Sequence, residues 1–164
     1  MPFPELNFSV PYVPTPLHVA RKMLELAGVG PEDVVYDLGS GDGRIPILAV
    51  EEFGAKKGVG IEIRNDLVQI AREEVKKRGL EDKVIIIHGD VLEVPLHEAT
   101  VVTMFLLPDL MELLRRKLER ELRKGARVVS HEYPMAGWKP KKVIRLEDEH
   151  MYHTLILYVS GESF

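Results

Sequence analysis

The sequence predicts an α/β fold in which a doubly wound, mostly parallel sheet of seven strands is covered by helices on both faces. Three observations support this prediction. Apolar runs of strand length alternate with helical segments along most of the chain. These runs are apolar throughout, which is typical of strands buried on both faces of a sheet. The last two runs have no helix between them, so we expect an antiparallel β-hairpin at one edge.

The first helix is predicted after an extended start. Ten residues of little pattern are followed by three prolines within six residues, which keep the chain extended. We therefore expect an N-terminal arm over residues 1–15. Thr15 and Pro16 predict the helix start, with a hydroxyl cap and then a proline at the first helical position. Apolar residues follow at helical spacing, and Gly28 and Gly30 end the helix.

Two strand–helix units come next. Residues 34–38 form a short β-type run that ends in a cluster of glycines, and residues 45–53 predict the helix behind it. Residues 58–62 form a second buried run. Asn65 is expected to cap the helix that follows, which has one apolar and one charged face and ends at Gly79.

The remaining elements complete the sheet. One further helix is amphipathic, with leucines in one row and arginines elsewhere. The final two strands form the hairpin, turned at an acidic tripeptide. The predicted strands are residues 84–88, 100–106, 126–130, 142–146 and 152–159, and the predicted helix is residues 109–122.

The composition is that of one globular domain, which we expect to span residues 1–164. Apolar residues make up 45% of the chain and charged residues 29%, which argues against disorder. The chain has no cysteine, and this excludes disulfides, thiolate metal sites and cysteine nucleophiles. Because the sequence shows neither a signal-peptide pattern nor an apolar run of about 20 residues, we expect a cytoplasmic protein without a membrane span.

Amide content and charge distribution add two expectations. Two asparagines and one glutamine stand beside many charged residues, as in proteins of heat-adapted organisms. The net charge of −4 is uneven, since residues 1–110 carry 11 Lys/Arg against 18 Asp/Glu and residues 111–164 carry 11 against 8. The first part therefore suits a basic partner, and the second part suits an acidic partner such as nucleic acid.

The glycine cluster after the first strand marks the ligand crevice, because ligands of such sheets bind beyond the carboxyl ends of the strands. It reads Asp-Leu-Gly-Ser-Gly-Asp-Gly-Arg over residues 37–44. A dinucleotide loop would need glycine or alanine at Arg44 and would place a pyrophosphate there. Asp37 and Asp42 bracket that position and would repel phosphate. The loop favours a cationic ligand without phosphate, and S-adenosylmethionine is such a ligand.

Two more acidic residues end the next two strands. Glu62 can accept hydrogen bonds from both ribose hydroxyls of that cofactor. Asp90 can accept one from the adenine amino group, while Val91 packs on the ring. Each acid could instead cap a helix or a turn. Their places at the ends of successive strands favour the cofactor interpretation.

The stretch from Asp37 to Asp90 resembles the class I S-adenosylmethionine-dependent methyltransferases, whose Rossmann-like seven-stranded sheet fits the predicted elements. Residues 10–16, 37–44 and 127–134 together resemble the small archaeal protein-lysine methyltransferases and their mitochondrial relatives. This resemblance covers nearly the whole chain. It implies lysine methylation of proteins with broad specificity, and an N-terminal arm lying over the methionine end of the cofactor. The candidate cofactor-binding residues are then Tyr12, Thr15, Asp37, Gly39, Ser40, Gly41, Glu62, Ile63, Asp90 and Val91.

Lysine methylation requires a neutral amine. With a pKa near 10.4, only about one lysine in 2,500 is neutral at pH 7. A dry, aromatic-lined channel lowers the pKa of the amine by desolvation, and the sulfonium charge of the cofactor acts in the same direction. The alternative for each aromatic residue is core packing, and no catalytic residue is assigned. The candidate acceptor-binding residues are Tyr12, Phe105, Leu106 (through backbone carbonyls), Tyr133 and Trp138.

Alternative functions stay open. Enzymes that methylate exocyclic base amines resemble one another in an Asp or Asn, two prolines and an aromatic residue after the fourth strand, and the Phe105-Leu106 pair departs from that pattern. An RNA methyltransferase and an inactive partner subunit remain the alternatives. The basic run over residues 115–127 is interpreted as a solvated helix face. The expected partners are proteins with exposed lysines, met by a monomer.

No metal site is predicted. His131 and Glu132 lack a second histidine at position 135, and Pro134 prevents the helix that a zinc-protease motif needs. His150 and His153 are expected to point to opposite faces of a strand.

Overall fold

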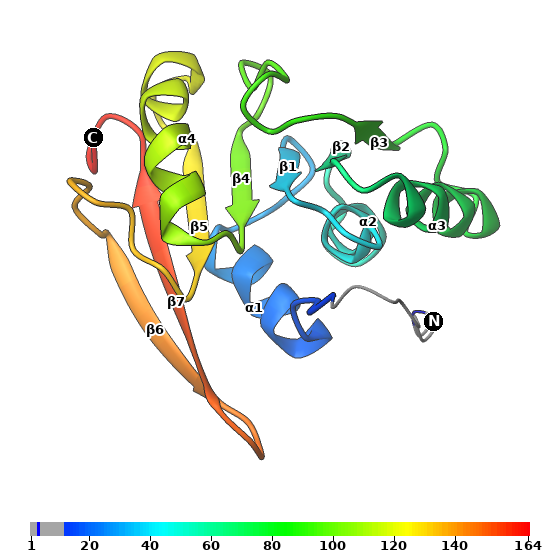
Figure 1. Cartoon of the computed structure of the whole chain (residues 1–164), viewed down its shortest axis with the longest axis horizontal. Coiled ribbons are helices and arrows are strands. Elements are labelled where there is room, and N and C mark those ends of the chain that lie inside the picture. The colour runs from blue at the N-terminus through cyan, green and yellow to red at the C-terminus, as the bar shows by residue number, and fades with distance from the viewer. Residues whose placement is uncertain (1–2, 4–11) are drawn as a thin grey trace.

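The computed structural model describes residue 3 and residues 12–164 of the chain, and it confirms the predicted fold (Figure 1). Seven strands form one sheet in the order β3-β2-β1-β4-β5-β7-β6. All neighbours are parallel except β5–β7 and β6–β7, which are antiparallel. The strands are β1 Val34–Leu38, β2 Lys57–Glu62, β3 Val84–His88, β4 Val101–Met104, β5 Arg127–His131, β6 Lys142–Glu147 and β7 Tyr152–Val159. The helices are α1 Leu17–Leu26, α2 Arg44–Glu51, α3 Asn65–Lys77 and α4 Pro108–Glu121.

The strand order reverses at β1. The chain runs outward from β1 through β2 to β3, and then returns to place β4 on the other side of β1. The loops after β1 and β4 therefore diverge, and a crevice opens between them, as at the switch point of other doubly wound sheets. The predicted glycine loop lies at this point.

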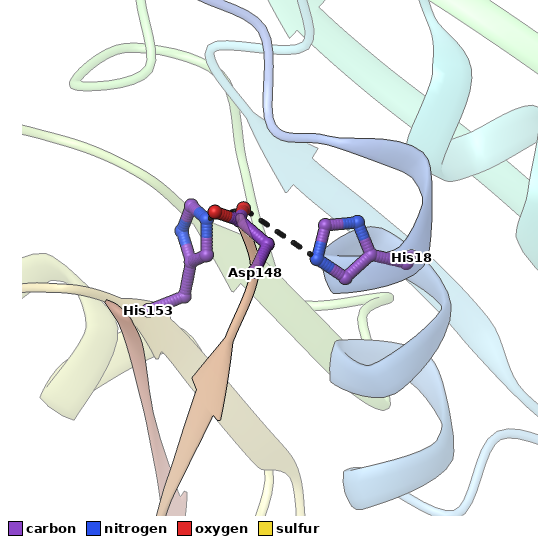
Figure 2. A group of neighbouring side chains, drawn as sticks. All are labelled: His18, Asp148 and His153. Carbon is purple, nitrogen blue, oxygen red and sulfur yellow. Dashed lines mark hydrogen bonds and ion pairs between the residues drawn. The ribbon is translucent and has the colours of Figure 1, made fainter. Parts of the chain in front are cut away.

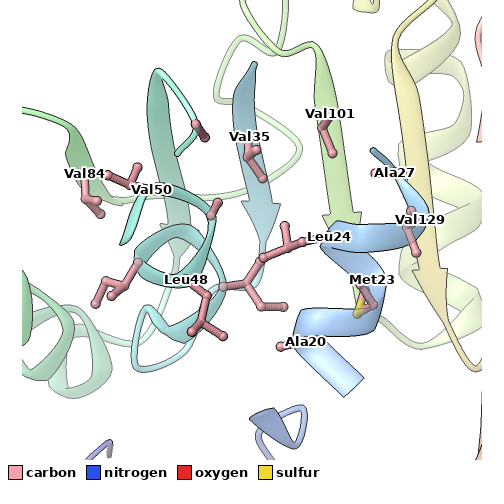
Figure 3. Packing of buried hydrophobic residues seen from close by; sticks show 14 of the residues in the cluster. Ala20, Met23, Leu24, Ala27, Val35, Leu48, Val50, Val84, Val101 and Val129 are labelled. Carbon is pink, nitrogen blue, oxygen red and sulfur yellow. The ribbon is translucent and has the colours of Figure 1, made fainter. Parts of the chain in front are cut away.

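Each face of the sheet has its own hydrophobic core. Helices α1, α2 and α3 cover one face, where Leu24, Leu48 and Val35 of β1 belong to what we call the first core (Figure 3). Helix α4 covers the opposite face, where Leu114 and Tyr36 belong to the second core. Because successive residues of β1 point to opposite faces, the strand is buried along its whole length. This explains its continuous rather than alternating apolar pattern.

Two predicted helix caps are wrong. Helix α1 begins at Leu17 with Pro16 in the cap position, and no side chain caps it. The Thr15 hydroxyl instead lies 3.3 Å from Nδ1 of His131, so a tertiary contact replaces the local one. Asn65 is the first residue of α3 rather than its cap, and its side-chain oxygen accepts a hydrogen bond from Gln69.

The predicted arm over residues 1–15 is described only in part, since residues 1–2 and 4–11 lie outside the described residues. Phe3 packs against the first core, with the Arg78 guanidinium 4.5 Å from its ring centroid. Residues 12–15 lead into α1 and line the crevice. Within the described part of the chain, no helix is long and apolar enough to span a membrane.

Candidate functional site

A cavity of about 270 Å³ lies beyond the carboxyl ends of β1, β2 and β4. It brings together seven of the predicted residues from four separate segments: Tyr12, Thr15, Asp37, Gly39, Ser40, Glu62 and Phe105. Its other lining residues, which were not among the predicted site residues, are Val13, Pro14, Arg44, Ile45, Arg64 and Leu67. Predicted cofactor-binding and acceptor-binding residues therefore share one cavity.

The glycine loop is shaped by hydrogen bonds to β2 and by left-handed backbone. The backbone N–H groups of Gly39 and Ser40 both donate to the carbonyl of Ile61. Gly41 has a φ of 56°, and a Cβ there would lie 2.0 Å from the Tyr12 hydroxyl. That hydroxyl in turn accepts a hydrogen bond from the Asp42 backbone N–H at 3.0 Å. Glycine at position 41 is thus required for Tyr12 to close over the loop.

The two loop acids differ in how their charge is balanced. Asp42 is bound by both Nε and Nη2 of Arg44, at 3.0 and 2.7 Å, in a bidentate pair. Arg44 also donates to the Thr15 carbonyl at 3.1 Å and so joins the arm to the loop. Asp37 is buried, and its carboxylate accepts a hydrogen bond from the Thr103 hydroxyl at 2.8 Å.

The electrostatics of Asp37 favour a cationic ligand. Burial raises the pKa of the Asp37 carboxyl well above its usual value, and the nearby Glu62 and Asp42 carboxylates act in the same direction. The Thr103 hydrogen bond opposes this shift without cancelling it. A cation bound in the cavity would stabilise the ionised form, whereas a phosphate would destabilise it. The donor set therefore fits S-adenosylmethionine and does not fit a dinucleotide.

Glu62 is held by backbone donors on the cavity wall. Its two carboxylate oxygens accept hydrogen bonds from the N–H groups of Gly41, at 2.8 Å, and Arg64, at 2.9 Å. The alternative that this acid orders a turn is therefore correct. A carboxylate has about four acceptor positions, so each oxygen keeps one for a ligand hydroxyl. Ordering the loop and binding a ribose are compatible roles.

Four predicted cofactor residues, Gly41, Ile63, Asp90 and Val91, do not line this cavity. Ile63 has 65% of its surface exposed, and its carbonyl lies 3.1 Å from Nε2 of His88 at the end of β3. Asp90 accepts a hydrogen bond from the Leu92 backbone N–H, and Val91 packs in the second core. Their role at the adenine stays a prediction. Gly41 donates its backbone N–H to the Glu62 carboxylate, and this is its observed role beside the cavity.

The predicted acceptor residues separate into two groups. Phe105, just beyond β4, lines the cavity, and Leu106 reaches back toward Gly39. Trp138 instead lies in the second core, stacked on Phe164 with ring centroids 3.8 Å apart, and its indole N–H donates to Glu119. Tyr133 packs partly buried against the same core. Core packing is therefore the observed role of Trp138, and the expectation that it lines a channel is not met.

The pairing of His131 with His153 was not predicted from the sequence. Their ring nitrogens lie 3.0 Å apart because β5 and β7 are antiparallel neighbours. His131 and His153 are 22 positions apart, so neighbours in sequence do not reveal the pair, and His150 lies in the β6–β7 turn. Figure 2 shows His153 and His18 on either side of Asp148. The pairing of the last two strands, which was predicted, is the signal that could have brought these side chains together.

Comparisons with known proteins agree with this geometry. The family model of the ANTKMT methyltransferase domain matches residues 37–142. A protein-lysine N-methyltransferase of Saccharolobus islandicus is 53% identical, over 93% of this chain and 95% of that protein. The adenine nucleotide translocase lysine N-methyltransferase of Mus musculus is 37% identical over 85% of this chain, which spans 60% of that longer protein.

Solved structures of other methyltransferases resemble this chain. The crystal structure of an RNA methyltransferase from Salinibacter ruber, in complex with S-adenosyl-L-homocysteine, superimposes with a TM-score of 0.86 at 46% identity. The match covers 93% of this chain and 96% of that one. The tRNA methyltransferase TrmK of B. subtilis, at 20% identity and a TM-score of 0.74, shares the fold.

Proposed function

Because this chain belongs to the ANTKMT methyltransferase family, we propose that it uses S-adenosylmethionine to methylate lysine side chains of proteins. The observation that carries the proposal is the 53% identity to an archaeal protein-lysine methyltransferase over nearly the full length of both chains. The apolar acceptor end of the cavity supports it, since Phe105 and Leu106 offer no side-chain hydrogen bond to a base amine.

The polar end of the cavity would hold the cofactor. Asp37 and the glycine loop suit its ammonium group, and Glu62 suits its ribose. Asp90, with Ile63 and Val91, is proposed for the adenine. Tyr12 and Thr15 would cover the methionine end, as the arm lies over the loop. The bound cofactor supplies an activated methyl group on a sulfonium, so the protein has to position the amine and manage its charge.

The apolar end of the cavity would receive the lysine. Phe105 and Val13 line the cavity, and the exposed side chain of Leu107 lies two positions after Phe105 in the sequence. An apolar surface desolvates the amine and lowers its pKa, while the aromatic face tolerates the cation before deprotonation. Such contacts recognise a lysine rather than its sequence context. We therefore expect a permissive enzyme that acts on exposed lysines of many proteins.

The test is incubation with methyl-labelled cofactor and a protein mixture, followed by ribonuclease and peptide mapping. Label that survives ribonuclease and maps to lysine is the expected result. Label found only in nucleic acid would contradict the proposal. A cavity variant, Asp37→Ala, serves as the inactive control.

RNA methylation is the second candidate, since the Salinibacter ruber structure is of an RNA methyltransferase. The basic run over residues 115–127 does not strengthen it, because three of its cations are paired with carboxylates. Arg115 and Lys117 of α4 and Arg127 of β5 have these partners at 3.1, 2.7 and 2.7 Å. This candidate predicts RNA binding that falls steeply with salt, measurable by filter binding.

We also propose that the chain acts as a single-domain, cytoplasmic monomer from a heat-adapted organism. Light scattering after size-exclusion chromatography would measure the oligomeric state, and a thermal melt would measure heat resistance. A dimer mass or an ordinary melting temperature would contradict these two expectations.

A further inference from the structure

A row of hydrogen-bonded side chains runs from the cavity toward the surface. Oγ1 of Thr15, on the cavity wall, lies 3.3 Å from Nδ1 of His131. Nε2 of His131 lies 3.0 Å from Nδ1 of His153, and Nε2 of His153 lies 2.8 Å from a carboxylate oxygen of Asp148. The four residues come from four places: the arm, β5, β7 and the β6–β7 turn. Figure 2 shows the outer end of the row.

The carboxylate of Asp148 fixes the direction of every hydrogen bond in the row. Backbone N–H groups, that of His150 first, lower the pKa of Asp148 to about 2, so it is ionised and can only accept. His153 must therefore carry its proton on Nε2 and accept at Nδ1. His131 then donates from Nε2 and accepts at Nδ1, so the Thr15 hydroxyl donates to it. The tautomers are inferred from this carboxylate.

This arrangement leaves the lone pairs of the Thr15 oxygen available to accept a hydrogen bond in the cavity. The inner part of the row is shielded from solvent, since His131 and His153 are both buried. Phe105, which lines the acceptor end, places its ring centroid 4.2 Å from that of His131. The row therefore starts beside the residue proposed to receive the lysine.

Among the described residues, three charged or titratable groups lie beside the row. Glu132 approaches both histidines, with a carboxylate oxygen 3.4 Å from Nε2 of His131 and 3.7 Å from Nδ1 of His153. His18 of α1 lies 3.8 Å from the Asp148 carboxylate. Arg44 binds the Thr15 carbonyl. Burial lowers the pKa of His131 to about 4, against the opposing effect of Glu132, so its ring is neutral at physiological pH and can relay a proton only by accepting at one nitrogen while it donates from the other.

We propose that Thr15, His131, His153 and Asp148 form a proton wire that takes one proton from the lysine ammonium and delivers it to solvent. This inference rests on the proposed lysine methylation. Thr15 is the residue that touches the amine, and the other three act through it.

The transfer balances along the row. An N–H bond of the ammonium breaks and an O–H bond forms on Thr15, whose own proton moves to Nδ1 of His131. The Nε2 proton of His131 moves to Nδ1 of His153, and the Nε2 proton of His153 moves to Asp148 and then to water. Turning of the hydroxyl and the rings restores the wire. The amine that remains has the lone pair that attacks the methyl group.

The test compares Asp148→Asn with Glu149→Gln. Both variants replace a carboxylate by an amide in the same turn, but Glu149 has 93% of its side chain exposed and lies outside the wire. An amide nitrogen can donate, so Asp148→Asn removes the fixed direction of the row. We expect kcat at pH 7 to fall about tenfold or more in Asp148→Asn and to stay unchanged in Glu149→Gln.

The pH profile separates a proton role from a structural one. Near pH 10 a large share of lysines is already neutral, so the kcat of Asp148→Asn should approach that of the unmodified enzyme. The dissociation constant of S-adenosylhomocysteine, measured by calorimetry, should be equal in all three proteins. A loss that is the same at every pH, or equal profiles for the two variants, would overturn the wire.

Two further outcomes are distinct. If the unmodified enzyme labels no lysine at any pH, the proposed function fails, and the proton wire fails with it because it rests on that function. If a chelator abolishes the activity and Zn²⁺ restores it, but not in Asp148→Asn, these side chains hold a metal ion and the wire is wrong.

Discussion

The two ends of the cavity are built in opposite ways. At the polar end, the Glu62 carboxylate accepts hydrogen bonds from the backbone N–H groups of Gly41 and Arg64, and Asp37 of β1 accepts one from Thr103 of β4. At the apolar end, His131 contacts Thr15, which lies 116 positions away in the sequence, and Phe105 of the loop after β4. The residues of the first end are recognisable in the sequence, as a glycine loop and acids at the ends of two strands. The second end exists only once the sheet and the arm are assembled.

The largest effect should come from the polar end. Replacing Asp37 by Ala removes the carboxylate that suits the cationic group of the cofactor. We expect the dissociation constant of the cofactor, measured by calorimetry, to rise at least 100-fold, which corresponds to about 3 kcal/mol of binding free energy. Because a buried charge is removed, the protein should remain folded by circular dichroism. Asp82→Ala, at an exposed position between α3 and β3 outside the cavity, is the control. An unchanged constant for Asp37→Ala would mean that the site is misplaced.

Trp138 tests the boundary of the apolar end. It packs against Phe164 and Tyr158 in the second core, so Trp138→Ala should lower the free energy of unfolding by about 3–5 kcal/mol. Chemical denaturation measures this. Activity per folded molecule should change little for every lysine substrate. If Trp138→Ala is stable and selectively raises the KM for the protein substrate, Trp138 lines the apolar end of the cavity after all.

Phe105 gives a smaller and more specific effect. Its ring lines the cavity and covers one face of His131, so Phe105→Ala should lower kcat/KM for the protein substrate about tenfold, by loss of desolvation. The dissociation constant of the cofactor product should stay the same. Leu113→Ala, on the exposed face of α4, is the matched control. If Phe105→Ala weakens only cofactor binding, Phe105 belongs to the cofactor site, and the division of the cavity into two ends is wrong.

Cofactor affinity should change gradually with pH, because Asp37 at the polar end of the cavity titrates. The pKa of Asp37 is raised in the free protein, so this residue contributes stability below its usual pKa, and that contribution is lost as pH rises through the raised value. A cation favours the ionised form. Binding should therefore strengthen with rising pH and release protons.

Calorimetry in buffers of different ionisation enthalpy measures that proton release. Asp37→Asn should abolish both the proton release and the dependence of affinity on pH, whereas Asp82→Asn should keep them. Affinity that falls as pH rises would contradict the assignment of a cationic group to Asp37.

The contrast between the two ends also explains what could be predicted from the sequence. Buried parallel strands and glycine turns have local signatures, so the sheet, the loop and the acids Asp37 and Glu62 followed from spacing alone. Trp138 could not be placed, because an aromatic residue in a loop has the same local pattern in a core as in a channel. The contacts of His131 with Thr15 and His153 depend on strand pairing and on the arm. They join residues 116 and 22 positions apart.

Crystallising the protein with S-adenosylhomocysteine tests the division of the cavity most directly. We predict the amino-acid part beside Asp37 and the glycine loop and under Tyr12 and Thr15, the ribose on Glu62, and the adenine toward Asp90, with the Phe105 end left open for the lysine. A ligand that fills the Phe105 end, or that leaves Asp37 and Glu62 without contact, would contradict the account.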